Sequence, residues 1–197
     1  YVYNLEKKKE KRITRYQRAY NPVFISSDSS LAFLSSHDGS QNIYHLNLKT
    51  EKITKLTDYD NHSILRGLSY DPENHRLLYN RTQHHYRDIY FYSFMDSSTE
   101  VLFANELWDE RDINYSNGEL IYSDDRSGIY NLRIDDEHYV TNVSGGAFMP
   151  DLNDNSEIVY SLYENGQYKI ALLSDPKIVE NDIVGYSPNY FMRNSGY

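Results

Sequence analysis

Short apolar segments and polar turns alternate along the chain, with a turn about every ten residues. The apolar segments lie at residues 31–36, 77–82, 120–125 and 158–163. Each follows a turn of Asp, Asn, Ser, Gly or Pro, at residues 26–30, 70–75, 115–119 and 153–157. No long stretch has the i, i+3, i+4, i+7 apolar spacing of an amphipathic helix, so the pattern predicts strands throughout.

Two further sequence features recur together with these segments. A tyrosine, usually after an aliphatic residue, recurs every 38 to 46 residues: Tyr3, Tyr44, Tyr90, Tyr130 and the looser match Tyr168. A threonine after an aliphatic residue ends several units: Ile13-Thr14, Leu56-Thr57 and Val140-Thr141. A repeat of about 40 residues with four strands per unit is typical of β-propeller blades.

The apolar segments do not alternate between apolar and polar positions. Residues 31–34 read Leu-Ala-Phe-Leu, so both faces of that strand are apolar. A strand that is apolar on both faces is covered on both faces. This is expected of an inner strand in a blade that is sandwiched between two neighbouring blades.

The composition supports a folded β protein and limits the classes of partner that the chain is expected to bind. The 197 residues are 39% hydrophobic and include 21 Tyr, a residue type that suits half-exposed strands. The formal net charge is −9, which repels phosphate backbones and argues against nucleic acid as a partner. The basic run at residues 7–12, KKKEKR, is interpreted as a solvated hairpin corner.

Two kinds of feature are missing from the sequence. The chain has no cysteine, which excludes disulfides, thiolate zinc sites and a cysteine nucleophile. No apolar run approaches the roughly 20 residues of a membrane-spanning helix, so no such segment is expected in this chain. The chain begins at Tyr1 rather than Met, and we expect it to be a fragment of a larger protein.

The repeat resembles that of TolB-type β-propellers, which are related to WD repeats. Residues 140–173 carry Val-Thr, Gly-Gly, an aromatic residue, a turn, an apolar strand and Glu-Asn-Gly in the order of that family. Residues 24–57 also follow it, with LAFLSSHDG, Ile43-Tyr44 and Leu56-Thr57. No unit keeps the family's full Ser-Pro-Asp-Gly turn. The resemblance implies an all-β propeller of four-stranded antiparallel blades.

The repeat covers residues 1–175 and predicts about four to five blades. The first strands belong to a half blade, and units near residues 21–58, 63–105, 112–141 and 147–174 follow. Residues 176–197 are expected to begin another blade, a linker or a following segment. Propellers of this family commonly close with six or seven blades, and an open arc leaves apolar faces bare. We therefore expect the remainder of the propeller, or a partner, to cover those faces.

One stretch has the spacing of a calcium loop. Asp151, Asn153 and Asn155 place oxygen ligands at alternate positions, as a hard cation requires. However, Ser156 stands where such a loop has glycine, and no glutamate follows at the required distance. We interpret the stretch as the turn into an inner strand, with calcium as the alternative, and expect no other cofactor.

Other candidate residues point to binding or to ordinary surface. His84 and His85 are adjacent, so on a strand they would face opposite ways and would not share a metal ion. Trp108 lies between two units and is interpreted as packed between blades, with a binding anchor as the alternative. Residues 124–126, Asp-Asp-Arg, are expected at a hairpin corner with local charge pairing. Ser187 lacks the second glycine of a nucleophile elbow and is not expected to be catalytic.

The favoured function is a non-catalytic scaffold for a protein or peptide partner, because no active-site motif is present. The resemblance implies a periplasmic or cell-surface role in a bacterial envelope assembly. The propeller of a prolyl-oligopeptidase-like serine peptidase, which gates substrate, is one alternative. A metal-dependent propeller lyase or glycosidase is the other.

Overall fold

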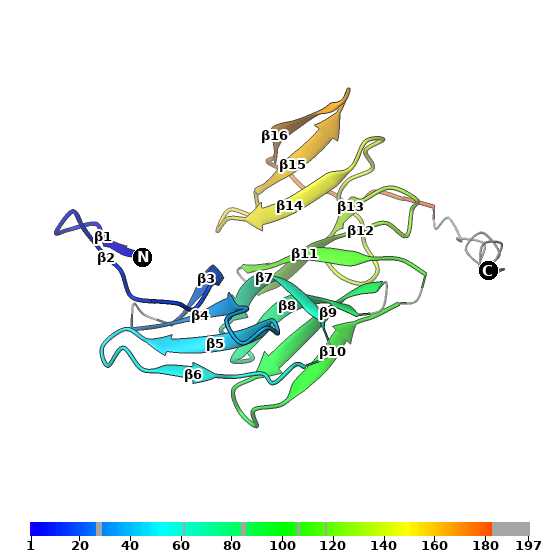
Figure 1. Ribbon diagram of the computed structural model, residues 1–197. Helices are drawn as coiled ribbons and strands as arrows, with labels where there is room; N and C mark the ends of the chain where they lie inside the picture. Colours follow the sequence, from blue (N-terminus) through cyan, green and yellow to red (C-terminus); the bar gives the residue numbers. More distant parts are fainter. Residues whose placement is uncertain (27–28, 61, 84–85, 106, 117, 183–197) are drawn as a thin grey trace.

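The computed structural model describes residues 1–26, 29–60, 62–83, 86–105, 107–116 and 118–182, and these form strands, turns and loops with no helix. Their strands make five antiparallel sheets that follow one another in chain order (Figure 1). The predicted all-β propeller is therefore confirmed. Within these residues no helix is long and apolar enough to cross a membrane.

Two sheets are complete four-stranded blades. The first has the order β3-β4-β5-β6, with β3 at Ala19–Ser26, β4 at Ser30–Ser35, β5 at Asn42–Asn47 and β6 at Ile53–Lys55. The second has the order β7-β8-β9-β10, with β7 at Ile64–Asp71, β8 at Arg76–Gln83, β9 at Tyr86–Ser93 and β10 at Thr99–Phe103. In each blade the strands lie side by side in the order of the sequence.

The other three sheets are less complete. One contains β11 at Glu110–Ser116, β12 at Glu119–Asp124 and β13 at Asn131–Arg133, and another contains β14 at Ala147–Leu152, β15 at Ile158–Glu164 and β16 at Gln167–Leu173. A two-stranded hairpin of β1 (Val2–Asn4) and β2 (Lys9–Lys11) precedes them all. Four blades and a half blade agree with the predicted four to five.

The first strands of successive blades contact one another, β3 with β7, β7 with β11, and β11 with β14. These strands therefore lie nearest the axis of the arc. Apolar clusters fill the spaces between sheets. Ala32, Leu34 and Ile43 of one blade pack against Leu65 and other residues of the next blade. The buried faces thus lie between blades, as in other repeat architectures.

The predicted apolar segments are the second strand of every blade: β4, β8, β12 and β15. In β4, Leu31 and Phe33 belong to the cluster that Val2 and Ile13 join. The alternate residues of β4 belong to the cluster shared with β7 and β8. The prediction that these strands are covered on both faces is confirmed for this blade.

The predicted tyrosine alignment is wrong by three residues in two units. The second and third strands form one equivalent cross-strand pair per blade: Phe33–Tyr44, Tyr79–Tyr90, Tyr122–Arg133 and Tyr160–Ala171. Tyr130 and Tyr168 therefore lie three positions before Arg133 and Ala171. Burial explains the register, because it places Leu132 rather than Ile129 in the core. Tyr130 and Tyr168 instead pack against Phe148.

Each first strand carries a β-bulge, which the sequence did not reveal. The register shifts between Tyr20 and Val23 in β3, and the equivalent shift recurs in β7, β11 and β14. The residue that starts each bulge has positive φ: 45° at Asn21, 58° at Gly67, 57° at Asp112 and 51° at Met149. Gly, Asn and Asp tolerate this conformation best, and Met149 adopts it despite its larger side chain.

The recurring threonine has a structural role. Thr141 Oγ1 donates to Asn131 Oδ1 at 3.0 Å and accepts from the Leu132 backbone N–H at 2.8 Å. Thr57 makes the same two contacts with Asn42 and Ile43, at 3.0 and 2.9 Å. The pair ties the start of the third strand to the segment that leaves the blade, so the repeated Thr reflects a repeated hydrogen-bond network.

After β16 the chain returns to the preceding blade. The Val179 backbone N–H donates to the Tyr139 carbonyl oxygen at 2.9 Å, and Tyr139 in turn bridges to Arg133 at the edge of β13. Val179 and Glu180 of the predicted terminal segment 176–197 thus lie beside the blade of β11–β13 or the segment that leaves it. Residues 176–178, 181 and 182 are described as well, and residues 183–197 lie outside the described ranges.

Candidate functional site

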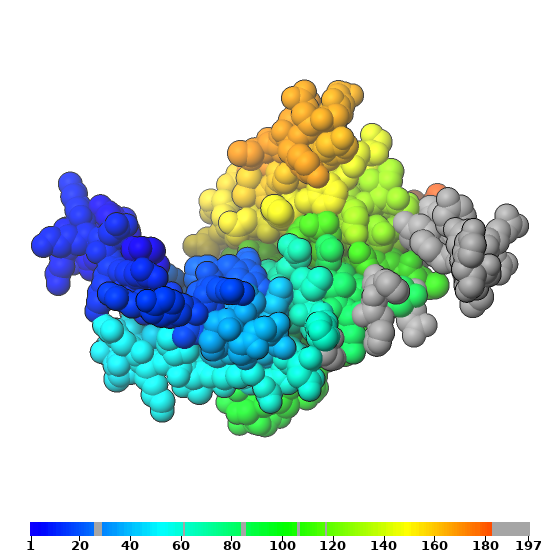
Figure 2. Space-filling model, in the orientation of Figure 1, coloured from blue at the N-terminus to red at the C-terminus, as the bar shows by residue number. Residues whose placement is uncertain are grey.

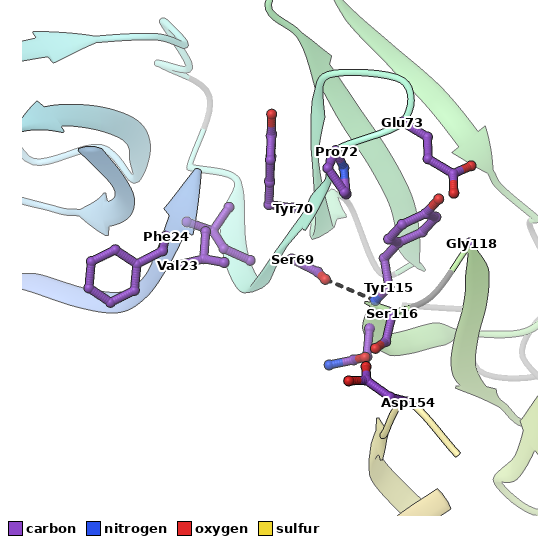
Figure 3. A pocket seen from close by; sticks show the side chains of 12 residues that line it. Val23, Phe24, Ser69, Tyr70, Pro72, Glu73, Tyr115, Ser116, Gly118 and Asp154 are labelled. Carbon is purple, nitrogen blue, oxygen red and sulfur yellow. Dashed lines mark hydrogen bonds between the residues drawn. The ribbon is translucent and has the colours of Figure 1, made fainter. Parts of the chain in front are cut away.

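The first strands of three blades end around a cavity of about 550 Å³ on one side of the arc (Figure 3). The turns from first to second strand close its rim. Its lining residues are Val23 and Phe24 from β3; Leu68, Ser69 and Tyr70 from β7; Pro72 and Glu73 from the next turn; Asn114, Tyr115 and Ser116 from β11; and Gly118 and Asp154. Four blades therefore contribute, as expected of a site at a propeller axis.

Aromatic side chains form much of the wall. Phe24 is 54% exposed, and Tyr70 and Tyr115 are partly buried. The Tyr115 backbone N–H donates to Ser69 Oγ at 2.9 Å, which joins β11 to β7 at the rim (Figure 3). Burial, followed by the charge of Asp71 and contact with Glu73, raises the pKa of Tyr115 to about 12. The Tyr115 phenol is therefore neutral at physiological pH.

Acidic and acceptor groups dominate the polar lining. Glu73 and Asp154 are exposed carboxylates, and the residues that line the cavity include no Lys, Arg or His. Asn114 Nδ2 donates to Asp151 Oδ1 at 3.2 Å, and Asn114 Oδ1 is buried without a hydrogen-bond donor. The cavity therefore offers several acceptors and no cationic group of its own.

A tight turn fixes the backbone of Glu73. The backbone N–H groups of Glu73 and Asn74 both donate to Asp71 Oδ1 at 3.1 Å, and Arg76 Nε lies 2.7 Å from Asp71 Oδ2. Burial alone would raise the pKa of Asp71, but the hydrogen bonds from Asn74 and the charge of Arg76 outweigh it and lower that pKa. Asp71 is thus an ionised anchor beneath the rim.

The predicted calcium residues lie beside the cavity, in and around the same turn as Asp154. Asn153 Oδ1 accepts from the backbone N–H groups of Asn155 and Glu157, both at 2.9 Å. Asp151 accepts from Asn114 as described. This oxygen of Asn153 therefore stabilises the turn. In the part of the chain that the structure describes, no group of three or more His, Cys, Asp or Glu is placed to hold a metal ion.

Trp108, one of the predicted binding residues, does not line the cavity. Trp108 is partly buried in the connection from β10 to β11, with the Arg126 guanidinium 5.0 Å from its ring centroid. His84 and His85 lie outside the described residues, as does Ser187. The cavity residues Glu73, Tyr115 and Phe24 had no signal of their own, because each comes from a separate repeat.

The predicted hairpin corner at residues 124–126 is confirmed, because it leads from β12 toward β13 and its charges are paired. Arg126 Nε lies 2.5 Å from Asp124 Oδ2, and Arg133 Nε lies 3.4 Å from the same oxygen. Asp124 and Arg126 are both buried, and Tyr139 O–H donates to Asp124 Oδ1 at 2.6 Å. The charges are local in sequence, but the neighbouring segments cover them.

Known structures share this fold although their sequences are distant. TolB from Acinetobacter baumannii superposes with a TM-score of 0.66 at 17% identity, covering 87% of this chain and 46% of TolB. A prolyl endopeptidase has a TM-score of 0.66 at 8% identity, covering 90% of this chain and 31% of the enzyme. An oligogalacturonate lyase in complex with manganese has a TM-score of 0.58 at 16% identity, covering 86% and 52%.

No family model matches the chain, and no curated protein matches it in sequence. The chain spans about half the length of the Acinetobacter TolB structure that it resembles. The repeated sheets around one axis, together with these likenesses, show that the chain has the fold of TolB-type β-propellers.

Proposed function

We propose that this chain is part of a non-catalytic propeller platform that binds a segment of a protein or peptide at the axial cavity. The observation that carries the proposal is the cavity itself, which first strands and turns of four blades build together. Its aromatic side chains, together with polar groups from several strands and turns, suit a site that binds a ligand. Loops from several blades around one axis also suit a broad binding surface.

The proposal is tested by selecting peptides from a random phage-displayed library on the purified chain. A Ser116→Trp variant fills the cavity from β11, and a Thr99→Trp variant adds the same ring at an exposed position outside the cavity lining. Selected peptides should bind the wild type and Thr99→Trp equally. They should bind Ser116→Trp at least about tenfold more weakly, a loss of about 1.4 kcal/mol. Peptides that bind all three proteins equally would contradict an axial site.

The two enzymatic alternatives have separate tests. A propeller that gates a serine peptidase would be followed by a hydrolase domain with a Gly-x-Ser-x-Gly motif in the complete protein. A metal-dependent lyase would retain a metal ion after purification, and His85→Ala would lower its metal content. The chain is similar to a prolyl endopeptidase and to a manganese-bound lyase, so both enzymatic alternatives are retained. Each similarity is one of fold.

A second partner is proposed at the free face of the last blade. Ile170 of β16 is equivalent in register to Ile43, Ile89 and Leu132. Those three side chains are 0% exposed, whereas Ile170 is 87% exposed, and Leu172 and Tyr168 beside it are also exposed. Figure 2 shows β15 and β16 of this sheet, in orange, at one end of the molecule.

The preceding junctions indicate what covers this face. The face of β4 and β5 that contains Ile43 packs against the first and second strands of the following blade. We therefore propose that another propeller blade, part of the remainder of the propeller, covers Ile170. A photo-crosslinking residue at position 170, in cells that make the complete protein, should react with a first or second strand of such a blade. A crosslink to a protein without a propeller would contradict it.

The place of action is also proposed by likeness. TolB-type propellers serve the bacterial envelope, and a periplasmic or cell-surface location would suit a platform for protein partners. Fractionation of cells that make the complete protein tests this location.

A further inference from the structure

We propose that the bound segment enters the axial cavity with a basic side chain, and that arginine is preferred over lysine. This inference rests on the proposed function and names the chemistry of its ligand. Donors and acceptors in the lining are unbalanced. The Glu73 and Asp154 carboxylates can accept hydrogen bonds from a ligand, and the lining supplies no basic side chain to meet them. A ligand with several charged N–H donors completes such a site.

Aromatic rings in the lining also suit a cationic ligand. Elsewhere in the molecule the chain places its own arginines over aromatic rings: Arg81 over Tyr59 at 4.3 Å, Arg133 over Tyr139 at 4.5 Å and Arg76 over Phe91 at 5.0 Å. Among the described residues, no such pair involves Phe24, Tyr70 or Tyr115. Tyr70 already contacts the rings of His75 and Phe94, so Phe24 and Tyr115 are the rings of the lining that can receive a cation from a ligand.

The two exposed carboxylates come from separate segments, Glu73 from the turn after β7 and Asp154 from the turn after β14. A guanidinium has five donors in a planar fork and can meet acceptors from several directions, whereas an ammonium is a compact point charge. The formal net charge of −9 also attracts a basic segment from a distance. Arginine therefore fits the site better than lysine.

The test uses a peptide selected on the wild-type chain, with its basic residue replaced in turn by lysine, by citrulline and by alanine. Citrulline keeps the shape of arginine and removes the charge. Affinity, measured by fluorescence anisotropy, should fall from arginine to lysine and should be about tenfold weaker with citrulline. Binding of the arginine peptide should also weaken as salt concentration rises.

Variants of the chain locate the effect. Glu73→Gln and Asp154→Asn should each weaken binding of the arginine peptide several-fold and leave binding of the citrulline peptide unchanged. Glu137→Gln removes an exposed carboxylate outside the cavity and should change neither peptide. This pairing of ligand and protein changes separates a contact with the cation from a general loss of charge.

The outcomes separate this inference from the proposed function. Two outcomes would overturn the basic ligand but leave the axial site supported. In the first, selected peptides lose binding to Ser116→Trp but contain no basic residue. In the second, their affinity does not change with Glu73→Gln or Asp154→Asn. A lysine peptide that binds as tightly as the arginine peptide would overturn the preference for arginine. If no selected peptide loses binding to Ser116→Trp, both the proposed function and this inference fall.

Discussion

Glu110 illustrates how the surroundings of a buried residue oppose its negative charge. Its side chain is 2% exposed, and its Oε1 lies 3.8 Å from Arg126 Nη2, beyond a hydrogen bond. Burial, followed by the nearby charge of Asp88, raises the pKa of Glu110 from its ordinary 4.5 to about 8, although Arg126 acts in the opposite direction. The folded chain therefore holds a proton on Glu110 at a pH where the unfolded chain has lost it.

This proton makes stability depend on pH. Between about pH 4.5 and 8 the unfolded state ionises Glu110 and the native state does not, so the free energy of unfolding falls as pH rises. Glu110→Gln stays neutral and removes this dependence. We expect the variant to resemble the wild type near pH 5 and to be more stable by a few kcal/mol, in order of magnitude, near pH 8.

Urea denaturation of both proteins at the two pH values measures the effect. Glu137→Gln, at an exposed position, serves as the control and should not change the pH dependence. An equal difference between wild type and Glu110→Gln at pH 5 and pH 8 would show that Glu110 does not titrate in this range.

At the scale of the strand, the link between Asn131 and Thr141 stabilises a blade whose sheet has only three strands. The fourth strand of that blade is reduced to a bridge at Tyr139, so the side-chain network replaces part of the missing backbone pairing. Asn131 Oδ1 also accepts from the Val143 backbone N–H at 2.8 Å. The network therefore sets where the chain leaves the blade and turns toward β14.

Thr141→Val keeps the side-chain shape and removes the hydroxyl. The buried Leu132 backbone N–H then has no acceptor, and we expect a loss of about 2 kcal/mol in the free energy of unfolding. Thr141→Ser keeps the hydroxyl and should lose less. Equal stabilities of the two variants, measured by urea denaturation, would contradict a role for this hydrogen bond.

At the scale of the whole molecule, equivalent positions have different surroundings because the arc is open in this chain. Leu132 and Ile170 occupy the same place in their blades, but the following blade covers only Leu132. The last blade therefore differs from the others in the exposure of the apolar face around Ile170. A further blade would bury this face.

Alanine substitutions at these two positions measure that difference. Leu132→Ala should lower the free energy of unfolding by about 2–5 kcal/mol, because it opens a cavity between blades. Ile170→Ala should change it by less than about 0.5 kcal/mol in this chain. A large loss for Ile170→Ala would indicate that something already covers this face in solution.

The sequence alone was sufficient to predict strands, the repeat and the second strand of every blade. These features depend on local patterns: apolar runs, turn residues and the period at which they return. The register of the third strand was harder to predict from the sequence. Tyr130 and Tyr168 fit the repeated sequence pattern, but burial of Leu132 sets the strand pairing. The bulge at Met149 also lacked a signal, since methionine does not favour positive φ.

The tertiary structure alone decided which residues meet at the axis and which charges are buried. Phe24, Glu73, Tyr115 and Asp154 lie in different repeats and come together only when the blades pack around one axis. Asp124 and Arg126 are polar in sequence, yet neighbouring segments close over them. A local pattern determines each blade, whereas contacts between residues some 40 positions apart determine the site, because the arc brings corresponding ends of its strands together.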